Sequence, residues 1–248
     1  MPGDLSNRVH CLASAKGQIY AGTERSGILI SSDRGATWSR LAGFPAVKVR
    51  CLIQSDEALY AGTETEGVLR SPDGGGSWIR HKLGLPEHAQ IFSLAMVKNS
   101  LFAGLYSKGL YVLNDPQSRW AKVDRVTPLV LAAAGDTLIA GHNPGGIYWS
   151  NDLGSTWSQS VASLAGGLGS TVLGTSEELS SNAPVWELGS IDSLSVAGAA
   201  AGIFYSEDRG RTWTRARQGL PEESPGISFL VQRNLILAAT IVKTERKD

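Results

Sequence analysis

The sequence predicts an all-β protein built from a repeated unit of about 40 residues, and three observations support this class. An eight-residue motif recurs along the chain and ends each time in a tryptophan, at Trp38, Trp78, Trp157 and Trp213. Each unit contains short runs rich in apolar and β-branched residues, which is typical of strands. The 29 glycines suit tight turns between such strands. Repeats of this length are typical of arrays and propellers, in which no unit can bury its faces alone.

The motif has the pattern Ser-x-Asp-x-Gly-x-Thr/Ser-Trp and is called the box below. Full copies occupy residues 31–38, 71–78, 150–157 and 206–213, and residues 113–120 keep only Asp115 and Trp120. The Asp carboxylate can accept backbone N–H bonds, Gly can adopt positive φ, and Trp buries a large apolar body. We therefore expect a self-contained structural turn at Asp33, Gly35 and Trp38, Asp73, Gly75 and Trp78, Asp152, Gly154 and Trp157, and Asp208, Gly210 and Trp213.

The boxes resemble the Asp-box, or BNR repeat, of sialidases, xyloglucanases, sortilin-like receptors and photosystem II assembly factors. The resemblance extends beyond the box, because residues 59–70 match residues 19–30, and repeats cover most of residues 9–240. It implies a β-propeller made of four-stranded antiparallel blades, with the boxes far from the functional face.

Taken in order, the units predict blades near residues 9–42, 49–83, 91–123, 128–160, 185–217 and 227–248 of one domain, residues 1–248. In the first unit, strands at 9–13, 18–23 and 27–31 precede the box and a short strand at 38–40 follows it. The last unit has two strands and no box, so we expect six blades with an incomplete last one; a shortened seven-bladed propeller is the alternative. The insertion at 161–184 should emerge on the face opposite the boxes.

The first strand of every unit carries a leucine that should pack between blades, where both sheet faces are covered: Leu12, Leu52, Leu94, Leu131, Leu188 and Leu230. Cys11 and Cys51 occupy the same position in consecutive units. Equivalent residues of stacked sheets lie about 10 Å apart, too far for a disulfide. We expect both cysteines to be reduced and buried.

The overall charge and hydropathy exclude some classes of partner. The 23 basic and 23 acidic residues give no net charge, which argues against a nucleic-acid or anionic-membrane partner. No apolar run approaches the roughly 20 residues that span a bilayer, and the first eight residues contain no signal-peptide core. We expect a cytoplasmic protein, or an exported one if the N-terminus is truncated; the oligomeric state stays open.

The loops that join the second and third strands should gather on one face, with the boxes on the other. On that face the second residue of the first strand varies while its leucine neighbour does not: His10, Arg50, Phe92, Leu129, Trp186 and Ser228. Variation within a constant frame is where a function can be grafted. The candidate binding residues for a protein or carbohydrate partner are Arg50, Trp186, His10, Arg25, Glu64 and His142.

No catalytic constellation is recognised. The sialidase resemblance would require an Arg-Ile-Pro segment, which is absent. Glu24, Glu64 and Glu66 could supply paired carboxylates for a glycoside hydrolase or lyase. The four histidines show no metal-ligand spacing, and no cofactor motif occurs. We expect a non-enzymatic binding or scaffold protein without cofactor or metal, with the polysaccharide-cleaving enzyme as the alternative.

Overall fold

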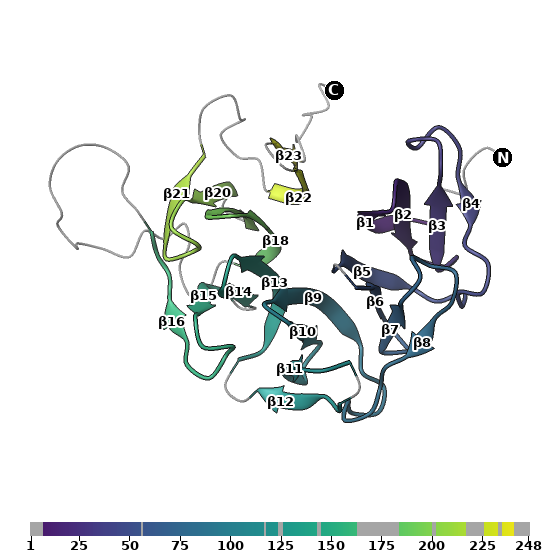
Figure 1. Ribbon diagram of the computed structural model, residues 1–248. Coiled ribbons are helices and arrows are strands. Elements are labelled where there is room, and N and C mark those ends of the chain that lie inside the picture. The colour runs from purple at the N-terminus through teal and green to yellow at the C-terminus, as the bar shows by residue number, and fades with distance from the viewer. Residues whose placement is uncertain are drawn as a thin grey trace, which may run out of the picture. The chain divides into compact units, whose positions relative to one another are not determined.

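The structure is a computed structural model that describes residues 7–55, 57–116, 118–123, 126–142, 145–162, 184–199, 202–216, 226–232 and 235–240. All regular elements in these ranges are β-strands, as Figure 1 shows. The chain divides into two compact units, residues 1–127 (the N-unit) and residues 128–248 (the C-unit). No helix in the described part of the chain is long and apolar enough to cross a membrane.

The N-unit consists of three antiparallel sheets of four strands each, and within each sheet consecutive strands are neighbours. The first sheet comprises β1 (Val9–Ala15), β2 (Gln18–Thr23), β3 (Ile28–Ser31) and β4 (Ser39–Arg40). The second comprises β5 (Val49–Gln54), β6 (Leu59–Thr63), β7 (Val68–Ser71) and β8 (Ile79–Arg80). The third comprises β9 (Ile91–Val97), β10 (Ser100–Leu105), β11 (Gly109–Leu113) and β12 (Ala121–Val123).

The C-unit contains two sheets of the same kind and a hairpin. The fourth sheet comprises β13 (Pro128–Ala134), β14 (Thr137–His142), β15 (Ile147–Ser150) and β16 (Ser158–Gln159). The fifth comprises β18 (Val185–Ile191), β19 (Leu194–Ala199), β20 (Gly202–Ser206) and β21 (Thr212–Arg215), and β17 (Val161–Ala162) joins β21 in parallel. The hairpin pairs β22 (Gly226–Gln232) with β23 (Leu235–Thr240).

These sheets are the blades of a β-propeller, so the predicted fold class is confirmed. In the described residues five blades have four or more strands, and β22–β23 stands where the incomplete sixth blade was predicted. The observed strands begin and end within about one or two residues of the predicted ones. Strand β17 was not predicted, because two residues give no period-2 pattern to recognise.

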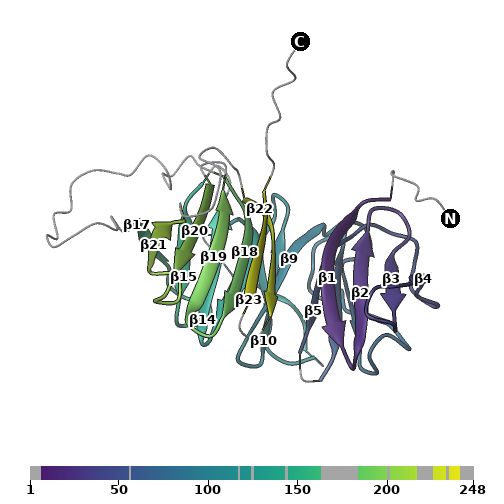
Figure 2. The same cartoon turned by 90° about the horizontal axis from the view of Figure 1, so that it is seen from above.

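Neighbouring blades pack through their first strands: β1 lies against β5 and β5 against β9 in the N-unit, as seen from above in Figure 2. This packing explains the glycine in the second strand of each blade. A Cβ on Gly22 would come within 2.7 Å of Val49 in the next blade, and one on Gly62 within 2.6 Å of Ile91. The glycines therefore let consecutive blades approach closely.

The predicted inter-blade leucines are buried at Leu52, Leu94, Leu131 and Leu188. Leu12 is a correction: its exposed fraction is 52%. It belongs to the first blade, whose strand β1 has its main contacts outside that blade with β5 of the second blade. Cys11 and Cys51 carry thiols as predicted, but they are half-buried rather than buried.

Each full box folds as the predicted turn. In the second box, Asp73 accepts hydrogen bonds from the Ser71 hydroxyl at 2.7 Å and from the Ser77 backbone N–H and hydroxyl at 2.9 and 2.7 Å. The Ser71 hydroxyl oxygen in turn accepts the Gly75 N–H. The boxes of Asp33, Asp152 and Asp208 repeat this set. The degenerate turn at Asp115 is closed through its backbone carbonyl by Ser118.

The boxes also hold the preceding blade, which the sequence did not predict. The Trp78 ring meets Phe44, from the connector after the first blade, edge to face at 4.8 Å. In the third blade, the Trp120 indole N–H donates to the carbonyl oxygen of His81, at the end of the second blade, at 2.8 Å. In the N-unit, the second and third box positions therefore also contact the blade before them.

The described start of the insertion lies against the fifth blade. The Ser160 hydroxyl donates to the Gly210 carbonyl oxygen, and the Val161 N–H donates to the Arg211 carbonyl oxygen. Strand β17 then runs parallel to β21, which leads away from the fifth box, so the face on which the insertion emerges stays a prediction. Residues 163–183, which make up most of the insertion, lie outside the described residues.

Candidate functional site: the bulge residues opposite the boxes

The second residue of the first strand is a β-bulge in every blade. In the first blade Val9 pairs with Thr23 and Cys11 with Gly22, so His10 is the extra residue. The same irregularity falls at Arg50, Phe92, Leu129 and Trp186. Bulges re-aim a side chain without breaking the sheet. The position that varies along the sequence is therefore also the position that the backbone sets apart.

The β22–β23 hairpin shows that one of the predicted variable positions, Ser228, is wrong. Gly226 pairs with Thr240 and Ser228 with Ala239, so the bulge residue of β22 is Ile227. Ser228, predicted from the sequence, is one residue too far along the chain.

The bulges lie at the end of the blade away from the boxes. In the first blade, His10 is level with the loop after Thr23, whereas Ile19, at the other end of β2, pairs with Ser31 where the box begins. The predicted separation of the loops from the boxes therefore holds within each described blade.

In the N-unit each bulge residue contacts the residue fourteen positions later, in the loop after the second strand. The three pairs are His10 with Glu24, Arg50 with Glu64 at 2.6 Å, and Phe92 with Tyr106 with ring centroids 5.1 Å apart. The loop backbone is fixed alike in all three blades by an N–H bond across the bulge. Three consecutive blades thus present a His–acid pair, an ion pair and an aromatic pair on one frame.

Glu24 is the centre of a charged group that joins the first two blades. Its carboxylate contacts Lys48 Nζ at 2.9 Å as well as the His10 ring. The hydrogen bond from Lys48, followed by that from His10, lowers the pKa of Glu24 to about 2. Glu24 is therefore a fixed negative charge near neutral pH, held between two basic groups.

Arg50 continues the surface into the third blade as a stack. Its guanidinium carbon lies 4.1 Å from the centroid of the Phe92 ring, a cation–π geometry. Phe92 is in turn nearly parallel to Tyr106, with 20° between the ring planes. Tyr106 ends the stack with half its surface exposed, at 51%. Arg50 Nε is buried and has no hydrogen-bond partner among the described residues, so the pair with Glu64 does not use every donor of this guanidinium.

The other predicted binding residue of the N-unit lies in the loop of the first pair. Arg25 is exposed, and its backbone N–H is held by the Asn7 side chain at 2.9 Å. The loop that carries Glu24 is therefore anchored by a contact outside the blade's own strands.

In the C-unit the bulge residue Trp186 is 43% exposed. A partner could therefore contact its ring, as the predicted binding role requires. Its neighbour Glu187 is half-buried, and burial raises the pKa of that carboxyl to about 7. His142 is half-buried with its ring 4.7 Å from Tyr148. Burial lowers the pKa of His142, and its Nε2 has no described partner.

The three carboxylates proposed for catalysis are all paired with basic side chains, and these partners lie on different strands or connectors. Glu64 pairs with Arg50 on an inner strand, whereas Glu66 pairs with Arg80 of the outer strand β8 at 2.6 Å. A retaining or inverting glycosidase needs one carboxyl protonated as general acid. The described carboxyl with a raised pKa is Glu187, in the other unit. Among the described residues no group of three His, Cys, Asp or Glu could hold a metal ion.

Sequence reasoning missed Lys48 and the pairing itself. Arg50, His10 and Glu64 were expected on this face, but as separate residues of a mouth. The pairing could have been found from the sequence, because in the aligned repeats the two variable positions are always fourteen residues apart. Lys48 lies before its strand and has no such constant spacing to a partner.

No protein-family model and no curated protein sequence matches the chain. Solved structures do. The chain is similar to a structure described as YCF48 bound to D1 peptide, with a TM-score of 0.65 and 16% identity over 94% of this chain and 76% of that one. It is similar to the computationally designed Ika8 protein, with a TM-score of 0.64 and 17% identity over 94% and 68% of the two chains.

Two longer proteins are similar over part of their length. The extracellular domain of BT4673, a putative hybrid two-component system from B. thetaiotaomicron, gives a TM-score of 0.68 at 17% identity over 96% of this chain and 31% of that one. The GH74 enzyme of Niastella koreensis gives 0.58 at 16% identity over 83% and 38%. Likeness at such identities concerns the fold alone, and it agrees with a chain that folds as a β-propeller.

Proposed function

We propose that this chain is a non-enzymatic binding propeller that takes a peptide segment of a partner protein on the bulge face of its N-unit. The observation that supports it best is the series of paired positions. The frame is repeated in three blades, while the side chains on it change from His–Glu to Arg–Glu to Phe–Tyr. The backbone frame fixes this position without fixing its side chain, so the position can carry different binding groups.

The chemistry of the face suits a peptide. Tyr106 offers an exposed ring for an apolar or planar side chain. The Arg50–Glu64 ion pair adds charged groups beside that stack. Glu24 between His10 and Lys48 offers fixed charge for orienting the ligand. A few aromatic and Arg anchors usually supply most of the energy of a protein interface. The structural likeness to YCF48, which was solved with a D1 peptide, agrees with this use of the fold.

The boxes further support placing the chain among the Asp-box repeat propellers. The argument is the hydrogen-bond set shared by four turns, from Ser, Asp and Thr or Ser in the same order. This placement concerns ancestry and adds no residue to the binding face.

The test is to select binding peptides from a displayed random library and to measure their dissociation constants for matched variants. We expect Tyr106→Ala and Arg50→Ala each to weaken binding by about tenfold or more, the cost of one anchor. Arg40→Ala, on the outer strand β4, is the matched control and should leave binding within about twofold of wild type, since surface changes away from the contact cost little. Equal losses in all three variants, or no selected peptide sensitive to Tyr106, would refute the proposal.

The alternative is a glycoside hydrolase or lyase, favoured by the likeness to the GH74 enzyme and by the exposed Tyr106, which could stack on a sugar ring. A turnover screen with chromogenic glycosides and plant polysaccharides separates the two. Turnover that is abolished by Glu64→Gln or Glu66→Gln, and kept by Glu57→Gln in an exposed hairpin turn, would replace the binding proposal by the enzyme.

A further inference from the structure

A groove of about 270 Å³ lies at the outer edge of the second blade, on different residues from the bulge face. Four basic side chains line it: Arg70 of β7, Arg80 of β8, and His81 and Lys82 just after β8. Its apolar part is formed by Ile79 and Leu83, which are 54% and 67% exposed. No acidic residue is among its described lining residues.

The positive charge of the groove is only partly compensated. Glu66 neutralises Arg80 through a 2.6 Å ion pair. Arg70 Nε donates a hydrogen bond to the Tyr60 hydroxyl oxygen at 3.4 Å. Tyr60 is neutral, so this bond does not compensate the charge of Arg70. Lys82 is exposed. In a chain of zero net charge, three full positive charges against one negative charge form a local site for an anion.

His81, which lines the groove, has one ring nitrogen without a hydrogen-bond partner among the described residues. Its Nε2 contacts the Pro116 carbonyl oxygen, which can only accept, so Nε2 carries the hydrogen. Nδ1 is buried and has no partner among the described residues. A buried polar atom without a partner is costly, so the wall of the groove at His81 favours a polar group rather than an apolar one.

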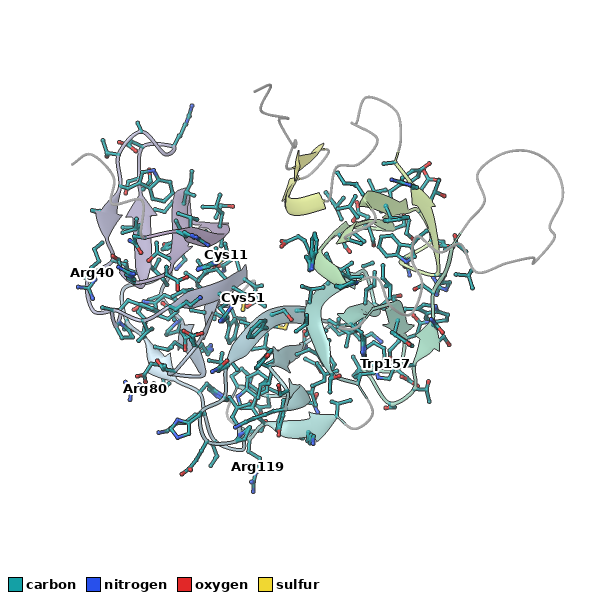
Figure 3. The ribbon with its side chains drawn as sticks, turned by 180° about the vertical axis from the view of Figure 1, so that it is seen from behind. Cys11, Arg40, Cys51, Arg80, Arg119 and Trp157 are labelled. Carbon is teal, nitrogen blue, oxygen red and sulfur yellow. The ribbon has the colours of Figure 1, made fainter. Side chains whose placement is uncertain are left out.

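Comparison with the other blades shows that these basic residues are not part of the repeat. The position of Arg70 is occupied by Ile30, Val112, Trp149 and Tyr205 in the other four blades, as their strand registers show. The position of His81 is occupied by Leu41, Val123, Ser160 and Ala216. Only the position of Arg80 is regularly basic, and Figure 3 shows Arg40 and Arg80 on the outer margin of their blades, away from Cys11 and Cys51.

We propose that this groove binds an oxyanion carried on a peptide side chain next to an apolar residue. The oxyanion would lie between Arg70 and Lys82, whose N–H groups would form charge-assisted hydrogen bonds to it. The apolar neighbour would cover Ile79 and Leu83. A phosphate, a sulfate and a carboxylate share this chemistry. Among the five described blades, the second alone has basic residues at the positions of Arg70 and His81.

The experiment uses the full chain and four acetylated, amidated Leu-X-Leu tripeptides, with X as phosphoserine, sulfotyrosine, glutamate or glutamine. Binding is followed by isothermal titration and by shifts of the ¹⁵N backbone signals of residues 79–83. We expect the oxyanion peptides to bind and to move these signals, and the glutamine peptide not to bind; the order among the first three identifies the natural oxyanion. Binding should weaken with salt, because exposed charges are screened.

Matched variants make the result decisive. Lys82→Ala, an exposed change that should not disturb folding, and Arg70→Met should each weaken the best oxyanion peptide by about tenfold, the loss of one charge-assisted hydrogen bond. Arg40→Ala, the counterpart of Arg80 in the first blade, should change it less than about twofold. Binding of the glutamine peptide as strong as that of the others, no binding at millimolar concentration, or insensitivity to Lys82→Ala would each overturn the site. Tyr106→Ala should have no effect here, so this test and that of the bulge face fail separately.

Discussion

At the scale of single residues, the box aspartates are ordinary surface groups given a fixed role by hydrogen bonds. The Thr37 hydroxyl and backbone N–H lower the pKa of Asp33 to about 2, and Thr156 does the same for Asp152. Burial alone would raise the pKa of Asp208, but hydrogen bonds led by those of Thr212 outweigh it. Each box therefore depends on a carboxylate that stays ionised well into acid.

The boxes predict the acid limit of the fold. A carboxyl whose pKa is lower in the folded state stabilises it fully above the unfolded pKa near 4, and this stability is lost as pH falls through about 2. The melting temperature should therefore fall between pH 4 and pH 2. Asp33→Asn should flatten this fall, whereas Glu57→Gln should not; parallel curves for all three proteins would contradict the role of the boxes.

Removing a box aspartate outright should destabilise the protein at neutral pH. Asp208→Ala leaves the backbone N–H and hydroxyl of Thr212 and the hydroxyl of Ser206 without their acceptor. We expect a loss of about 1–3 kcal/mol in the free energy of unfolding, measured by urea denaturation. Asp208→Asn, which keeps one oxygen acceptor, should lose less. An Asp208→Ala protein as stable as wild type would show that the turn does not need its carboxylate.

Glu187 should act on stability in the opposite direction. Its pKa of about 7 in the folded state exceeds the ordinary 4.5 because burial disfavours the charged form. The folded state then binds more protons between these values, so stability falls as pH rises from 4.5 to 7 and stays low above. Glu187→Gln should therefore be more stable than wild type at pH 8, by up to about 3 kcal/mol, and no more stable at pH 4. An advantage that is independent of pH would contradict the assignment.

At the scale of elements, strand boundaries could be predicted from the sequence because each of five units repeats the same pattern of apolar runs and turns. The bulge could not be predicted, because a bulge changes the pairing of two strands without changing their composition. For the same reason Ser228 was assigned in place of Ile227. Contacts between a box and the preceding blade, such as Trp78 with Phe44, join residues of different repeats, and a single unit gives no sign of them.

The close approach of blades predicts a strong effect of a small substitution. Gly62→Ala would place a Cβ within 2.4 Å of Cys51 Sγ and 2.6 Å of Ile91. Overpacking of this kind costs about 1–3 kcal/mol, measured by thermal or urea unfolding. Adding Cys51→Ala removes one of the two clashes and should recover part of the loss. A Gly62→Ala protein with unchanged stability would mean that the first strands of these blades do not lie so close.

At the scale of the whole molecule, the sequence predicts one domain. A single domain should unfold in one cooperative transition. Trp38, Trp78 and Trp120 belong to the N-unit and the other four tryptophans to the C-unit. The test uses a variant in which the tryptophans of one unit are replaced by Phe, so that fluorescence reports on the other unit alone. If the chain is a single domain, its melting temperature by fluorescence should equal that by far-ultraviolet circular dichroism, which reports on all strands. Two separated transitions would show two domains.

The candidate site was predictable in part. Arg50, His10, Glu64 and Trp186 could be located because they vary within a constant frame. The partners of these residues could not, since contacts such as Lys48 with Glu24 and Arg50 with Phe92 cross from one blade to the next. The groove at Arg70 and His81 was missed for a different reason: its basic residues are close in space but lie on two strands and a connector.

The central claim is that the ligand meets the bulge residues of the N-unit, and NMR shift mapping tests it most directly. A peptide selected for binding is titrated into ¹⁵N-labelled protein, and backbone shifts are followed for every assigned residue. We predict that the largest shifts fall at His10, Glu24, Arg50, Phe92 and Tyr106 and disappear in Tyr106→Ala. Shifts that cluster instead at the box turns, or on the outer strands β4, β8 and β12, would contradict the claim.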